Sequence, residues 1–132
     1  MARMSLPPSG VNAAYGLASS VRDLAWFDRR LGYGAEDGLL RAATRQFAWN
    51  RAASDLPSGV GWFQQDYNGT SIVWQFGVVA NAYSSLIVKV PDRRLTFILL
   101  ANSDQLSAPF DMAAGDVNAS VFARLFLRIY VP

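Results

Sequence analysis

The sequence contains no cysteine and no histidine among its 132 residues. The absence of cysteine excludes disulfides and cysteine nucleophiles, and the absence of both residue types excludes the usual zinc sites. Catalytic triads that use histidine as the base are excluded as well. Lys89 is the only lysine, so a serine–lysine pair formed within this chain would have to use it.

Charged residues are scarce, at 17% of the chain, whereas a typical soluble domain has about 25%. The net charge is only +2 and the arginines are scattered along the chain, so we expect no nucleic-acid partner. The apolar runs are far shorter than the ~20 residues that span a bilayer, and we expect no membrane segment. The first ten residues, MARMSLPPSG, lack the apolar stretch of a signal peptide, which leaves the localisation open.

The order of local patterns predicts one domain, residues 1–132. Its parts are an irregular entry at 1–18, a helical region at 19–50, strands at 59–102 and a C-terminal helix at 118–130. Ser20, three residues before Asp23, predicts the start of a first helix that ends near Gly32. A second helix is expected at about 39–49.

Two hairpins are the strongest local signals. Asn68-Gly69 separates two strand-like runs and favours a type I′ turn, because both central residues need a positive φ. The second pair of runs, 83–90 and 95–102, flanks a turn that begins at Pro91. The sequence therefore predicts an α+β fold, in which N-terminal helices and a C-terminal helix accompany an antiparallel sheet of about four to five strands.

The strand at 95–102 is apolar on both faces and needs a cover on each. The C-terminal helix supplies one cover, and something else must supply the other. Helical spacing predicts that five side chains of this helix are buried: Val121, Phe122, Leu125, Phe126 and Ile129.

Few side chains in the sequence suggest catalysis by themselves. Ser85 and Lys89 lie on the same strand face but roughly 13 Å apart, which is too far for proton transfer. We therefore expect Lys89 to be a solvated strand residue. We expect Asp104 and Asp111 to stabilise turns and Asp116 to lie at the helix entry. Their spacing fits no calcium loop, and we expect neither a metal nor a cofactor.

The order of several motifs is nevertheless distinctive. The chain resembles the C-terminal part of the serine β-lactamase-like, or penicillin-binding-protein-like, family, which includes class C β-lactamases, D-Ala-D-Ala peptidases and esterases. The resemblance rests on four segments followed by a closing amphipathic helix: GLASSVRDLAWF (16–27), GVGWF (59–63), WQFG (74–77) and AYSSLIVKVPDRRLTFILLANS (82–103).

The resemblance implies that Gln75-Phe76-Gly77 occupies the place of the family's Lys-Thr-Gly or His-x-Gly signature. The amide of Val78 would then be the second donor of the oxyanion hole. Gln75 donates and accepts hydrogen bonds but carries no charge. The predicted substrate-binding side is therefore Gln75, Phe76, Gly77 and Val78.

The family's other two signatures, Ser-x-x-Lys and Tyr-x-Asn, do not occur in the sequence. The resemblance places both of them before residue 1, so we interpret the chain as a truncated and catalytically incomplete part of a hydrolase. The parent protein would act on a small-molecule or peptide acyl substrate. The strand at 95–102 would leave an open sheet edge, which predicts either self-association or pairing with a missing N-terminal segment.

Three alternatives stay open from the sequence. Trp74-Gln75-Phe76 is also typical of an ordinary strand with an outward polar residue. The chain as a whole could be a non-enzymatic binding or assembly module derived from the same fold. It could also be an unrelated α+β domain whose motifs match by chance.

Overall fold

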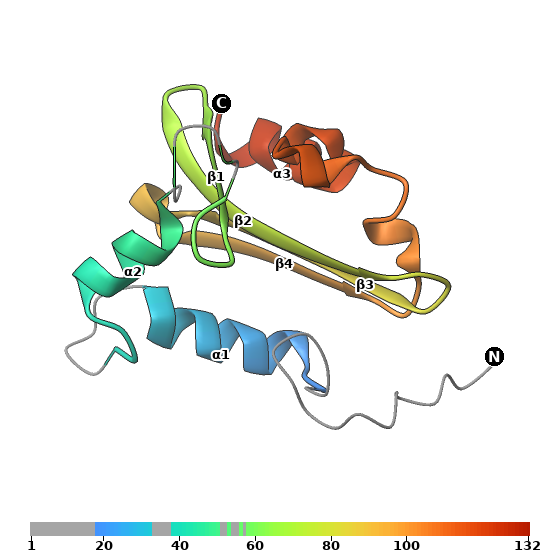
Figure 1. Ribbon diagram of the computed structural model, residues 1–132, viewed down its shortest axis with the longest axis horizontal. Helices are drawn as coiled ribbons and strands as arrows, with labels where there is room; N and C mark the ends of the chain where they lie inside the picture. The colour runs from blue at the N-terminus through green and yellow to red at the C-terminus, as the bar shows by residue number, and fades with distance from the viewer. Residues whose placement is uncertain (1–17, 33–37, 51–52, 54–55, 57) are drawn as a thin grey trace.

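The computed structural model describes residues 18–32, 38–50, 53, 56 and 58–132. Within these residues the chain forms two helices, four strands and a third helix, in that order (Figure 1). The elements are α1 (Val21–Gly32), α2 (Ala42–Trp49), β1 (Phe63–Tyr67), β2 (Thr70–Val79), β3 (Tyr83–Val90), β4 (Leu95–Ala101) and α3 (Val121–Tyr130). The predicted α+β class is confirmed. The irregular entry predicted at 1–18 falls almost entirely outside the described residues.

The four strands form one antiparallel sheet in the order β1-β2-β3-β4. The first hairpin turns at Asn68 and Gly69, whose φ angles of 51° and 73° fit the predicted turn. Arg94, with a φ of 52°, closes the second turn after Pro91. Each strand therefore pairs with its neighbour in the sequence, and the short turns fix the register.

Helix α3 covers one face of the sheet, and α1 and α2 lie on the other side (Figure 1). The α3 face holds most of the apolar core, including fully buried Trp74 and Val88. The ring of Phe126 stacks on Phe97 of β4, with centroids 4.7 Å apart. Ser120 caps the helix, since its hydroxyl accepts a hydrogen bond from the Ala123 amide.

The prediction of which face of the C-terminal helix is buried is mostly wrong. Among the five predicted side chains only Phe126 is buried, and it shares that face with Ala123 and Leu127. The other four are exposed: Val121, Phe122, Leu125 and Ile129. The helix is apolar around most of its circumference, so spacing alone fits two overlapping stripes, and packing against Phe97 selects one of them.

Helix α1 begins after Ser20, whose hydroxyl accepts a hydrogen bond from the Asp23 amide at 3.2 Å. The second helix is shorter than predicted and begins at Ala42. In the part of the chain that the structure describes, no helix is long and apolar enough to cross a membrane.

Strand β4 lies at one edge of the sheet. Its inner edge pairs with β3 from Val90↔Leu95 to Ser84↔Ala101, while no strand of the described residues pairs with its outer edge. The strand contains no charged residue and no proline, which are the usual means of protecting an edge.

Two leucines of α3 test which side of the helix packs on the sheet. Leu127 is fully buried and Leu125 is 60% exposed. We expect Leu127→Ala to lower the free energy of unfolding by about 2–5 kcal/mol, and Leu125→Ala by about 0.5 kcal/mol or less. Urea denaturation of both variants measures the difference, and equal losses would contradict this packing.

Candidate functional site

The four predicted site residues lie on β2, but they do not share one surface. Because side chains alternate along a strand, Gln75 and Gly77 face α1, while Phe76 and Val78 face the α3 side. The Phe76 ring lies 6.0 Å from those of Phe63 and Trp74, within the α3-side core. Only Gln75 and Gly77 therefore point toward the α1 side of the sheet.

The side chain of Gln75 is held by two hydrogen bonds. Its Nε2 donates to the carbonyl of Gly61 at 2.7 Å, and its Oε1 accepts from the Phe76 amide at 2.8 Å. These bonds fix the amide orientation and leave one Nε2–H available. Gln75 can therefore offer a directed neutral hydrogen bond, but neither a positive charge nor a titrating proton.

The hydrogen bond from Gln75 to Gly61 joins the WQFG segment to the GVGWF segment, which are separate in the sequence. The Gly59–Trp62 loop precedes β1, and Gly61 has a φ of 77°, a conformation that favours glycine. A side chain at Gly59 would overlap the carbonyl oxygens of Asn50 and Ala48 at the end of α2. Glycines at both positions thus allow the loop to pass close to α2 and present the Gly61 carbonyl to Gln75.

The absence of a side chain at Gly77 leaves room for the Ser85 hydroxyl on the neighbouring strand β3. Gly77 pairs in register with Ser85, and a Cβ at Gly77 would lie 2.9 Å from the Ser85 Oγ. A larger residue at Gly77 would therefore have to displace this hydroxyl. Ser85 also lies on the α1 side of the sheet, so Gln75, Gly77 and Ser85 form a small polar group there.

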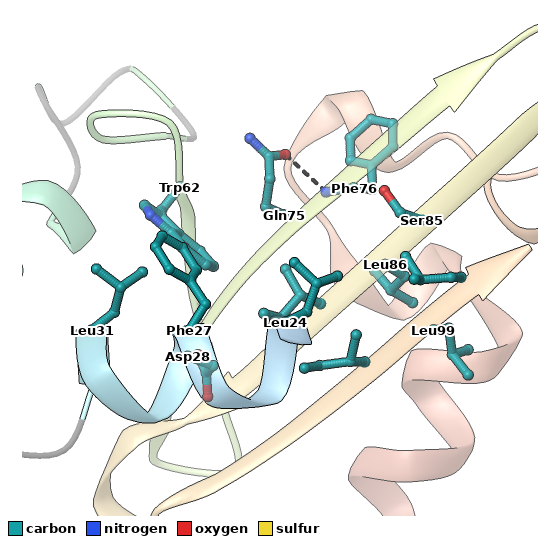
Figure 2. A pocket seen from close by; sticks show the side chains of 13 residues that line it. Leu24, Phe27, Asp28, Leu31, Trp62, Gln75, Phe76, Ser85, Leu86 and Leu99 are labelled. Carbon is teal, nitrogen blue, oxygen red and sulfur yellow. Dashed lines mark hydrogen bonds between the residues drawn. The ribbon is translucent and has the colours of Figure 1, made fainter. Parts of the chain in front are cut away.

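A cavity of about 260 Å³ lies beside this polar group, between α1 and the sheet. Figure 2 shows Leu24, Phe27 and Leu31 projecting from α1 toward the strands, with Trp62 beside Phe27. We call this space the α1 cavity. Its lining residues are Leu24, Phe27, Asp28, Leu31, Trp62, Gln75, Phe76, Ser85, Leu86, Ile87, Ile98, Leu99 and Leu100.

Lys89 is buried at the α1 side of β3, and the prediction that it is solvated is wrong. Its ammonium group forms an ion pair with Asp28 of α1, and the two side chains are 0% and 7% exposed. The indole rings of Trp49 and Trp62 lie 5.3 Å and 5.7 Å from Nζ, in the range of cation–π contacts. Burial lowers the pKa of Lys89, although its hydrogen bond and ion pair with Asp28 act in the opposite direction.

Sequence reasoning missed Asp28, Lys89 and Trp62 as neighbours. One signal was present, because Lys89 lies between Val88 and Val90 in a strand with apolar residues on both faces. A lone lysine in such a strand either reaches water at an edge or needs a buried carboxylate. The partner lies 61 residues earlier in the chain, and the strand pattern does not identify it.

Asp104 stabilises a turn as predicted, whereas Asp116 caps the short 3-10 helix Val117–Ala119 and Ser120 caps α3. The carboxylate of Asp104 accepts a hydrogen bond from the Asn81 amide, which lowers its pKa. Burial acts to raise the pKa of Asp116, but hydrogen bonds from Gln65 and Asn118 outweigh it and lower the pKa. Asp111 precedes the Met112–Ala114 turn without a capping hydrogen bond from its side chain. Within the described residues, no group of three His, Cys, Asp or Glu side chains could hold a metal.

A family model described as Beta-lactamase matches residues 2–120, which include all four strands and Gln75–Val78. Searches of curated proteins and of solved structures give no significant match. The family match agrees with the resemblance drawn from the motifs.

The ion pair can be tested by removing one partner and then both. Asp28→Ala leaves the buried ammonium group of Lys89 without its carboxylate, and we expect it to lower the free energy of unfolding by about 3–5 kcal/mol. The double variant Asp28→Leu, Lys89→Met replaces the pair with apolar groups, and we expect most of that loss to be recovered. Urea denaturation provides the measurement, and a double variant as unstable as Asp28→Ala would contradict the assignment.

Proposed function

The chain belongs to the beta-lactamase family, and from this premise we propose that it is the C-terminal part of a serine hydrolase of the β-lactamase/penicillin-binding type. The observation that carries the proposal is Gln75-Phe76-Gly77 on β2, with Gln75 fixed at the border of the α1 cavity. The reaction class is acyl transfer and hydrolysis on a β-lactam, peptide or ester carbonyl.

In this proposal the chain contributes the substrate side of the site. Gln75 directs its remaining Nε2–H toward the substrate, and Gly77 allows the reacting group to approach the strand. The amide of Val78 acts as the second donor to the oxyanion that forms when a serine attacks the carbonyl. The serine then becomes acylated, and water hydrolyses the acyl-enzyme.

The nucleophile and its base come from a Ser-x-x-Lys segment that this sequence does not contain. Spacing that places serine and lysine on one helical face is needed for the lysine to accept the serine proton. Lys89 does not replace that base, because it is buried against Asp28 on the sheet. The 132 residues therefore contain an incomplete catalytic set.

A non-enzymatic binding or assembly module is the second candidate. The state of Gln75 favours it, because this neutral side chain already uses both amide atoms in hydrogen bonds within the chain. The coding DNA before Met1 separates the two functions. An in-frame Ser-x-x-Lys followed by Tyr-x-Asn supports the hydrolase, whereas a stop codon and a ribosome-binding site support the module.

We also propose that the outer edge of β4 pairs with a further strand, from a second copy or from another segment of a longer protein. On this edge strand the apolar side chain of Leu100 is 40% exposed. An edge strand that lacks charged residues and proline and exposes an apolar side chain favours strand addition.

The incomplete catalytic set predicts that the purified 132-residue chain has no hydrolytic activity. We expect no turnover of 4-nitrophenyl acetate or of a chromogenic cephalosporin above the buffer rate, and no covalent adduct with penicillin by mass spectrometry. Denatured chain at equal concentration controls for reaction with surface groups. Saturable turnover that is lost on denaturation would contradict the proposed incompleteness.

The open edge predicts self-association of the isolated chain. Leu100 on β4 and Tyr83 on the inner strand β3 are both 40% exposed, which makes them a matched pair. Leu100→Lys places a charge beside the edge, and we expect it to shift the mass measured by light scattering toward the monomer. Tyr83→Lys should leave the mass unchanged. If the unsubstituted 132-residue chain is monomeric at all concentrations, this would count against pairing between copies.

A further inference from the structure

The α1 cavity has the size and surface of a small-ligand site. Its volume of about 260 Å³ exceeds the roughly 150 Å³ of an engineered apolar cavity that binds benzene. Leu24 and Leu31 form its α1 side, and Ile87 and Ile98 form part of its sheet side. A ligand of benzene size or somewhat larger would therefore be surrounded mainly by hydrocarbon.

The few polar groups of the cavity determine which apolar ligand it accepts. Among its lining residues, Asp28 alone carries a formal charge, and that charge is negative. The ammonium group of Lys89 compensates Asp28, so the ion pair leaves no net positive charge for a ligand. An anionic ligand would lose its hydration beside a carboxylate without gaining a cationic partner.

Gln75 lies at the border of the cavity and keeps one hydrogen-bond donor. Its Oε1 and one Nε2–H are used by Phe76 and Gly61, and its second Nε2–H is left to donate. A carbonyl oxygen is a suitable acceptor for such a neutral donor. An apolar ring attached to an uncharged carbonyl therefore suits both the apolar lining of the cavity and the hydrogen-bond donor of Gln75.

We propose that the α1 cavity binds an uncharged aromatic or aliphatic acyl group and discriminates against carboxylates. This inference rests on the proposed function for the role of the bound group as part of a substrate, because Gln75 borders both sites. The binding itself needs no nucleophile. It can therefore be measured on the 132-residue chain, whether or not the chain belongs to a hydrolase.

Methyl benzoate and benzoate are a suitable pair of probes, because they share the ring and differ mainly in charge at neutral pH. Titration of the folded chain, followed by nitrogen-15 NMR, reports each affinity through the Trp62 indole and the amides of α1. We expect methyl benzoate to bind about ten-fold more tightly than benzoate or better. Benzoate binding as tight as methyl benzoate, or no binding of either probe, would overturn the proposal.

Three variants locate the binding. Leu24→Trp fills part of the cavity, and we expect it to weaken methyl benzoate binding by about ten-fold. Leu125→Trp makes the same change on the exposed side of α3 and should have no effect. Gln75→Lys adds a cation at the border, and we expect it to strengthen benzoate binding by about five-fold. Equal effects of the two tryptophan variants would show that the probes bind elsewhere, which would overturn the assignment.

The outcomes separate this inference from the proposed function. Selective binding of methyl benzoate together with a stop codon before Met1 would support the ligand site and contradict the proposed hydrolase function. An upstream Ser-x-x-Lys with no binding of either probe would support the proposed hydrolase function and contradict the α1 cavity as its acyl site.

Discussion

The ion pair between Lys89 and Asp28 is the interaction on which the α1 side of the molecule depends. It joins the middle of α1 to β3, between residues 61 positions apart in the sequence. Burial makes this pair sensitive to the loss of either partner, since a lone charge cannot recover its hydration there. Asp28 is also a lining residue of the α1 cavity, so the pair lies at the border of the space between α1 and the sheet.

The two faces of the sheet are thus covered by different physical means. On the α3 face, Phe126 and Leu127 pack against the strands, and contact with apolar side chains supplies the stability. On the α1 face, Leu24 and Leu31 border a cavity instead of filling a core. The α3 face is therefore tightly packed, whereas the α1 face combines a buried ion pair with a partly open space beside Gln75.

Local patterns in the sequence predicted the strands well, because each hairpin is specified by residues next to each other. Asn68-Gly69 and Pro91 mark two of the three turns, and the pairing of β1 with β2 and of β3 with β4 follows from them. The buried side of α3 could not be read in the same way, since the helix offers two apolar stripes and the choice depends on Phe97. Burial of Lys89 depends on Asp28 and on two tryptophans distant in sequence. At the candidate site, the motif identified Gln75 and Gly77, whereas the α1 cavity exists only once α1 lies on the sheet.

The pH titration of Lys89 by carbon-13 NMR is the most direct test of this account. Because the chain contains a single lysine, its Cε signal is unambiguous. The account predicts a pKa below the value of about 10.4 for lysine in an unstructured peptide, since burial disfavours the charged form. It also predicts that the side-chain protons of Lys89 show cross-relaxation to the rings of Trp49 and Trp62. A Lys89 that titrates at or above the peptide value, without contact to either ring, would contradict it.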